Sequence, residues 1–92
     1  MDSTFEDAVV AVIEDVPRGE TVTYGEVAEE AGFPGAARAV GNVLQTVPDL
    51  PWWRIITTNG RLVPGLETEH TQRLRSEGIS VRNGRVTMKG HP

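Results

Sequence analysis

The segment Gly32-Phe33-Pro34-Gly35 constrains the fold more than any other part of the chain, because it separates two short stretches with helical periodicity. Before it, Thr23 and Glu26 form a capping box that predicts the start of a helix. After it, apolar residues recur at helical spacing from about 36 to 47. Two short helices joined by about four glycine-containing residues are typical of a helix-turn-helix, although a simple pair of packed helices gives the same pattern.

A further helix is expected before this motif, and β structure after it. Apolar residues at helical spacing between Phe5 and Val16 predict the first helix of the chain. Further along, the β-branched run 54–58 leads into Asn59-Gly60, which is a strong type I′ hairpin signal, and residues 61–63 would return as the second strand of a wing.

The last part of the chain is also predicted to contain a helix followed by a hairpin. A short helix is expected near residues 68–77, and a second hairpin is expected around Asn83-Gly84. The predicted fold class is therefore α+β and mostly helical, a winged-helix or helix-turn-helix domain with short β-hairpins. We expect residues 1–92 to form a single domain of this kind.

The complete absence of cysteine excludes several classes of chemistry at once. Disulfides, thiolate metal sites and thiol nucleophiles are all impossible in this chain. The two histidines have no metal-ligand spacing, so we expect no metal and no cofactor. No stretch of 18 apolar residues and no signal-peptide pattern is present, which predicts a protein of the cytoplasm, or of the nucleus in a eukaryote, without membrane contact.

Charge is distributed unevenly along the chain, although the net charge is only −4. Residues 1–30 carry nine acidic residues and one arginine, which gives −8, whereas residues 31–92 carry eight basic and four acidic residues, which gives +4. A domain with one repelled and one attracted face can dock on DNA in a fixed orientation. The alternative is an acidic, solubilising surface with scattered arginines.

One face of the predicted 36–47 helix is lined with small residues around a single arginine and two amides: Ala36, Ala37, Arg38, Gly41, Asn42 and Gln45. A glycine inside a helix costs about 1 kcal/mol relative to alanine. Either a nucleic-acid groove or another backbone must come close to this face, or the glycine serves tight packing between helices.

Both tryptophans of the chain stand side by side in Pro51-Trp52-Trp53-Arg54. If a strand begins there, their side chains point to opposite faces, one into the core and the other into a pocket or to the surface.

Five segments in this order resemble the DNA-binding domain of the O6-alkylguanine-DNA alkyltransferases: 22–28, 36–41 with its Arg-Ala-Val-Gly core, 51–56, Asn59-Gly60, and Ser76-Glu77-Gly78. Active members of that family have Pro-Cys-His-Arg where this chain has Pro51-Trp52-Trp53-Arg54. Their cysteine accepts the alkyl group and their histidine, backed by a glutamate, activates it. Trp52 and Trp53 therefore exclude alkyl transfer by the family mechanism, and Glu77, which matches the glutamate, is left with nothing to support.

The resemblance is closer to the alkyltransferase-like proteins, which lack the cysteine, bind O6-alkylguanine in DNA and direct it to nucleotide excision repair. It implies a non-enzymatic monomer whose partners are double-stranded DNA containing O6-alkylguanine and nucleotide-excision-repair proteins. Arg38 matches the arginine finger that fills the space left by a flipped base, and Tyr24 matches the tyrosine that guards the flipped nucleotide. Trp53 departs even from this subfamily, which often keeps the histidine.

Two sets of site residues follow from the resemblance. The implied DNA-binding residues are Thr23, Tyr24, Ala36, Ala37, Arg38, Gly41, Asn42, Gln45 and Thr58. The implied pocket for the damaged base is formed by Tyr24, Trp52, Trp53, Arg54, Leu62 and Val63. Two other interpretations stay open, a winged-helix transcriptional regulator and a protein-interaction module with a decayed alkyltransferase fold.

Overall fold

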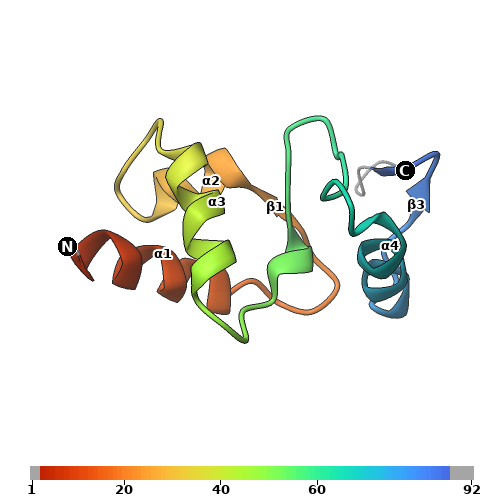
Figure 1. Ribbon diagram of the computed structural model, residues 1–92, viewed down its shortest axis with the longest axis horizontal. Coiled ribbons are helices and arrows are strands. Elements are labelled where there is room, and N and C mark those ends of the chain that lie inside the picture. The colour runs from red at the N-terminus through yellow and green to blue at the C-terminus, as the bar shows by residue number, and fades with distance from the viewer. Residues whose placement is uncertain (1–2, 88–92) are drawn as a thin grey trace.

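The computed structural model describes residues 3–87, in which four α-helices alternate with short strands (Figure 1). In chain order the elements are α1 (Ser3–Glu14), β1 (Val22–Thr23), α2 (Tyr24–Glu30), α3 (Ala37–Thr46), the 3₁₀ turn η1 (Trp52–Arg54), β2 (Ile55–Ile56), α4 (Glu67–Ser76), β3 (Val81–Arg82) and β4 (Arg85–Val86). The predicted α+β, mostly helical fold class is confirmed. Within the described part of the chain, no helix is long and apolar enough to cross a membrane.

Helices α2 and α3 form the predicted helix-turn-helix. The capping box at the start of α2 is complete, because the Glu26 amide donates to Thr23 Oγ1 over 3.0 Å and the Thr23 amide donates to Glu26 Oε1 over 2.8 Å. The turn between the helices requires glycine at two positions, since Gly32 and Gly35 have φ values of +93° and +89°. Val27, Ala28, Val40 and Val43 bury the inner faces of the two helices against α1.

The prediction of a β-hairpin at Asn59-Gly60 is wrong. Strand β2 pairs in parallel with β1, with Val22 opposite Ile55 and Thr23 opposite Ile56. The left-handed conformations that a type I′ turn needs at both central residues occur instead at Asn83 and Gly84, whose φ values are +57° and +74°. The hairpin β3–β4 around them is therefore confirmed.

Gly60 has a different role from the one its sequence context suggests. It ends a turn in which its amide donates to the Thr57 carbonyl over 2.9 Å, and its φ is +76°. A Cβ atom at this position would lie only 2.8 Å from the carbonyl oxygen of Val86. The glycine therefore lets the loop after β2 close against β4, where Arg61 forms an isolated antiparallel bridge with Arg85.

Strand β2 separates two hydrophobic clusters, because its two residues point to opposite faces. Ile55 belongs to the cluster formed with α1, α2 and α3. Ile56 belongs to a second cluster, which packs the C-terminal half of the chain and includes Leu62, Leu74, Val81 and Val86. In Figure 1 the two halves accordingly lie on either side of β2, with α3 in one and α4 in the other.

Candidate nucleic-acid interface

An open cavity of about 420 Å³ lies beside the start of α3. Its lining comes from the two helices of the motif and from the loop after β2, and consists of Tyr24, Gly25, Ala37, Arg38, Gly41, Thr57 and Thr58. Most of these side chains are small, and the Arg38 side chain is exposed at the rim. Within residues 3–87, Arg38 has no ion-pair partner, so its guanidinium is available to an anionic or aromatic ligand.

Gly41 lies inside α3, next to the Tyr24 ring. A Cβ atom added there would meet Tyr24 Cε2 at 3.7 Å, which is an ordinary van der Waals contact. Packing within the chain therefore does not require a glycine at this position. Tight packing between α2 and α3, one of the alternatives left open by the sequence, therefore does not account for the glycine.

A second, more enclosed cavity of about 280 Å³ adjoins the first and is called the inner cavity. It is mostly apolar and is lined by Tyr24, Gly41, Leu44, Gln45, Trp52, Val63 and Leu66. Tyr24 and Gly41 line both cavities, so they form the boundary between the outer and the inner one. Burial of its ring raises the pKa of Tyr24 above the ordinary value for tyrosine, so its hydroxyl stays protonated as a neutral donor.

Trp52 supplies the aromatic wall of the inner cavity. Residues 52–54 form a 3₁₀ turn, so the strand considered at this point in the sequence does not begin there. The Trp52 and Trp53 rings meet edge to face, with 5.9 Å between their centroids and 87° between their planes. The Trp52 ring also packs against the ring of His70 at 5.0 Å between centroids. The position of Trp52 is therefore fixed from two sides by aromatic contacts.

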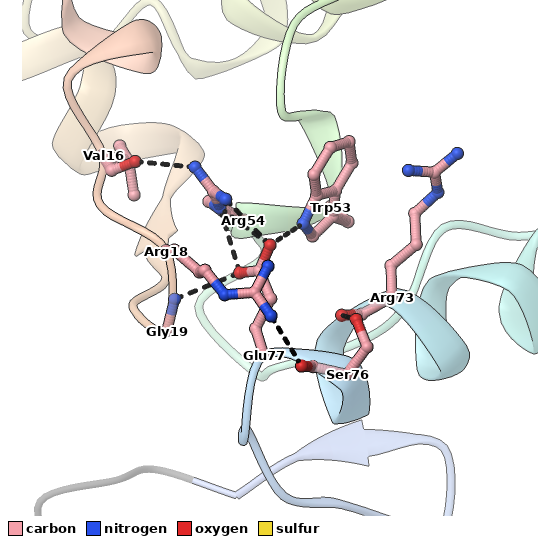
Figure 2. A network of polar contacts seen from close by, with 8 residues as sticks. All are labelled: Val16, Arg18, Gly19, Trp53, Arg54, Arg73, Ser76 and Glu77. Carbon is pink, nitrogen blue, oxygen red and sulfur yellow. Dashed lines mark hydrogen bonds and ion pairs between the residues drawn. The ribbon is translucent and has the colours of Figure 1, made fainter.

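Trp53 and Arg54 lie outside the lining of both cavities and converge on Glu77 instead (Figure 2). Glu77 Oε2 accepts from the Trp53 indole at 2.8 Å and from the Arg54 guanidinium at 2.8 Å, while Oε1 accepts from the Gly19 amide at 3.1 Å. The same guanidinium donates to the Val16 carbonyl over 3.0 Å. The expectation that Glu77 has nothing to support is therefore wrong.

The hydrogen bond from Arg54 is the main reason why the pKa of Glu77 is lowered to about 2, and the bonds from Trp53 and the Gly19 amide lower it further against the effect of burial. The same bond raises the pKa of Arg54. Only 3% of the Glu77 side chain is exposed. This carboxylate is thus charged at neutral pH, and it links the segment after α1 to the 3₁₀ turn and the end of α4.

His70, which the sequence did not single out, links Val63 of the inner cavity to the 3₁₀ turn that carries Trp52. It is fully buried, its Nδ1 accepts from the Val63 amide at 3.1 Å, and its Nε2 lies 2.9 Å from the Trp53 carbonyl, to which it donates in this tautomer. Burial lowers its pKa below the ordinary value for histidine, so the ring is neutral at pH 7. The spacing of four residues to the buried Leu74 was the one signal in the sequence that places it on the inner face of α4.

The other sequence-predicted residues are distributed around these cavities. Thr23 caps α2, Ala36 precedes α3, and Asn42 is exposed on α3 without lining either cavity. Leu62 is buried in the second hydrophobic cluster, whereas its neighbour Val63 lines the inner cavity. Leu44 and Leu66 belong to the inner cavity but were missed, because an apolar residue next to a core cannot be told from a cavity wall by pattern alone.

Arg73 adds a cationic contact to the tryptophan pair from the side of α4. Its guanidinium lies 4.5 Å from the ring centroid of Trp53 and 5.8 Å from that of Trp52. It also pairs with Glu69 at 2.9 Å. Cation–π contacts of this kind favour a fixed orientation of the indoles.

Comparison with known proteins gives consistent matches over nearly the whole chain. Residues 4–79 match the sequence model described as 6-O-methylguanine DNA methyltransferase, DNA binding domain. A DNA base-flipping protein of Vibrio parahaemolyticus is 39% identical over 88% of this chain and 87% of its own length. Alkyltransferase-like protein 1 of Schizosaccharomyces pombe is 33% identical over 88% of this chain and 81% of its own length. The crystal structure of S. pombe Atl1 in complex with damaged DNA containing O6-carboxymethylguanine superposes with a TM-score of 0.83 at 29% identity, covering 97% of this chain and 91% of that one.

Proposed function

Because the chain belongs to the family of the 6-O-methylguanine DNA methyltransferase DNA-binding domain, we propose that it binds O6-alkylguanine in DNA without removing the alkyl group. The observation that carries this proposal is the pair of adjoining cavities beside α3, the inner one lined by Trp52, which stands where the active enzymes of the family have their cysteine. The relatives named DNA base-flipping protein and alkyltransferase-like protein 1 support it.

The outer cavity suits entry of α3 into the minor groove. That groove is only about 6 Å wide, so a helix that enters it must present small side chains. Ala37 and Gly41 meet this requirement, and Arg38 stands beside them with a free guanidinium. We infer that Arg38 occupies the space that a flipped base leaves in the stack, where a planar cation can stack and donate hydrogen bonds at once.

The inner cavity suits the extruded base. Flipping costs a few kcal/mol, and least for a weakened pair such as one with O6-alkylguanine. Stacking on an aromatic side chain returns about 1–3 kcal/mol, which is of similar size. The Trp52 ring offers that surface, and Leu44, Val63 and Leu66 add an apolar lining for the alkyl group.

The residues at the catalytic positions of the family offer no route to alkyl transfer by the family mechanism. Trp52 carries no nucleophilic atom, and the Trp53 indole donates a hydrogen bond but cannot accept a proton. Glu77 is already occupied by Trp53, Arg54 and Gly19. We therefore infer that the complex persists unreacted, and that a monomer bound in this way marks the lesion for nucleotide-excision-repair proteins.

A titration with matched duplexes tests the proposal. Binding to a duplex with one central O6-methylguanine should be tighter than to the same duplex with guanine, measured by fluorescence anisotropy at one fixed salt concentration. Arg38→Ala should remove most of this preference, and Trp52→Ala should weaken lesion binding by about 5- to 150-fold, the equivalent of 1–3 kcal/mol. Asn42→Ala is the matched control for the preference, because Asn42 is an implied DNA-binding residue of α3 that lines neither cavity, so its loss should weaken binding to both duplexes equally. Equal affinities of the unaltered protein for the two duplexes would exclude the proposed function.

A second measurement tests the absence of alkyl transfer. After incubation with DNA that carries a radiolabelled methyl group on guanine O6, the protein should remain unlabelled once the DNA is digested. Stable label on the protein would show that another side chain accepts the alkyl group.

A further inference from the structure

Three exposed arginines meet on one face of the C-terminal hairpin. Arg82 and Arg85 are register partners on β3 and β4, and Arg61 is bridged to Arg85 from the loop after β2. Residues directly opposite one another in neighbouring strands project on the same side. The partner pair Val81 and Val86 is buried on the other side of the hairpin, which leaves the arginine face to solvent.

This arrangement brings like charges together without compensation. Among residues 3–87, no carboxylate forms an ion pair with Arg61, Arg82 or Arg85, and their guanidinium groups make no hydrogen bonds there. The neighbouring arginines differ, because Arg54 pairs with Glu77 and Arg73 pairs with Glu69. Like charges directly opposite in a sheet are unfavourable, so the three arginines do not serve the stability of the hairpin.

The three arginines are connected to the proposed DNA interface by one short loop. The Arg61 amide donates to Thr57 Oγ1 over 2.9 Å, and Thr57 and Thr58 line the outer cavity beside Arg38. In Figure 1 the loop after β2 lies between α3 and the hairpin strand β3. A duplex seated on α3 that continues past this loop therefore comes next to the hairpin.

We propose that Arg61, Arg82 and Arg85, here called the arginine ribbon, bind phosphates of the DNA that flanks the lesion. This inference rests on the proposed function, since it takes DNA as the ligand of α3. Guanidinium groups bind phosphate oxygens with paired, charge-assisted hydrogen bonds. Such contacts fix the orientation of a protein on a duplex and carry no information about the base. The arginine ribbon thus adds affinity that is equal for damaged and undamaged DNA.

The test compares the salt dependence of binding for matched charge variants. Arg85→Gln and the triple variant Arg61→Gln/Arg82→Gln/Arg85→Gln are titrated with the lesion duplex and with the undamaged duplex at several salt concentrations. Arg18→Gln is the matched control, because Arg18 is also exposed but belongs to the acidic segment 1–30 and donates to the Ser76 carbonyl, so it is not part of the arginine ribbon. Each lost phosphate contact should reduce the slope of log K against log salt by about 0.9.

We expect the triple variant to lose about 2.7 from this slope and to bind both duplexes more weakly by the same factor, with an unchanged preference for the lesion. Arg85→Lys should keep most of the slope. If the triple variant keeps the slope of the unaltered protein, the inference is overturned and the proposed function stands. The same holds if Arg18→Gln lowers the slope as much as Arg85→Gln does. Conversely, if the slope changes as expected but no preference for the lesion exists, the proposed function fails and the arginine ribbon remains a DNA contact. If the protein binds neither duplex, both fail.

Melting temperatures control for folding. Because removing one of two opposed charges relieves a repulsion, the single variants Arg82→Gln and Arg85→Gln should melt at or above the temperature of the unaltered protein. These single variants carry the test if the triple variant does not fold.

Discussion

The indole nitrogen of Trp53 donates to Glu77 Oε2 over 2.8 Å. In the active enzymes that the chain resembles, a histidine backed by the matching glutamate activates the cysteine. An indole keeps the donor that points at the glutamate but has no lone pair with which to take a proton. The exchange therefore preserves the hydrogen bond that holds this part of the fold and removes the base.

Replacement of Trp53 separates the hydrogen bond from the bulk of the ring. Trp53→Phe keeps an aromatic ring but leaves Glu77 without this donor, which should cost about 1.5–3 kcal/mol of unfolding free energy. Trp53→His has a smaller ring yet retains an N–H group for Glu77. In urea titrations at pH 7.5 the histidine variant should be the more stable of the two, and the opposite order would show that ring packing outweighs the hydrogen bond.

Glu77→Gln should destabilise the protein in a pH-dependent way. The pKa of Glu77 is lowered from 4.5 to about 2, so its ionised form stabilises the fold by an amount on the order of 3 kcal/mol above pH 4.5. This contribution is present above the unfolded pKa and is lost as the pH falls from 4.5 towards 2. Urea midpoints of the variant and the unaltered protein should therefore differ clearly at pH 7 and converge as the pH approaches 2. A gap that stays constant over this range would contradict the assignment.

His70 should make stability depend on pH in a higher range. Its folded pKa lies below the ordinary 6.5, because burial disfavours the charged ring, so stability falls as the pH drops below 6.5 towards the folded pKa. His70→Gln offers one acceptor to the Val63 amide and one donor to the Trp53 carbonyl, and it should abolish this dependence between pH 7.5 and 5.5. His70→Ala leaves both partners unsatisfied and should cost about 2–4 kcal/mol at pH 7.5.

The readout for His70 is urea unfolding at the two pH values, with lesion affinity measured in parallel. Because His70 joins the Trp53 carbonyl to the Val63 amide, protonation also weakens the wall of the inner cavity. Lesion affinity of the unaltered protein should fall with pH over the same range, and that of His70→Gln should not. An equal pH dependence in both proteins would assign the effect to another group.

Gly60→Ala tests the closure of the loop after β2. The added Cβ would lie 2.8 Å from the Val86 carbonyl, in a residue whose φ is +76°. Gly65 is the matched control, because its φ of +86° imposes the same backbone strain and nothing lies within 4 Å of its Cβ position. Gly65→Ala should cost about 1–2 kcal/mol and Gly60→Ala about 2 kcal/mol more, as measured by thermal unfolding. If the two variants lose the same free energy of unfolding, the Val86 backbone moves away from the added Cβ at little cost.

The local signals in the sequence predicted the helix-turn-helix well, because its determinants lie within a few residues. The capping box of Thr23 and Glu26 and the glycines of the turn fix their conformation through neighbours in the chain. The hairpin prediction at Asn59-Gly60 was wrong because the structure there depends on residues far away in the sequence. This pair carries the local signature of a type I′ turn, but the pairing of Ile55 with Val22 and the contact of Gly60 with Val86 are long-range. Tertiary contacts decided the outcome there.

The candidate site divides in the same way. Trp52, Tyr24 and Arg38 were singled out by residue type and by resemblance, and the structure brings them to two adjoining cavities. His70 and the partners of Glu77 could not be predicted, since hydrogen bonds between residues such as Gly19 and Glu77 depend on how two separate halves of the chain meet. Pattern alone gave no reason to place them together.

The parallel pairing of β1 with β2 has a consequence for how the protein folds. It joins residues 22 and 55, so the intervening chain, with both helices of the helix-turn-helix, becomes a closed loop. Closing it requires a non-local contact whose entropic cost must be met before α3 gains its final partners, which makes this step a candidate for the slow phase of folding. Once closed, α3 and Trp52 belong to one cooperative unit, so hydrogen exchange in the strand pair and in the helix should report a single opening event.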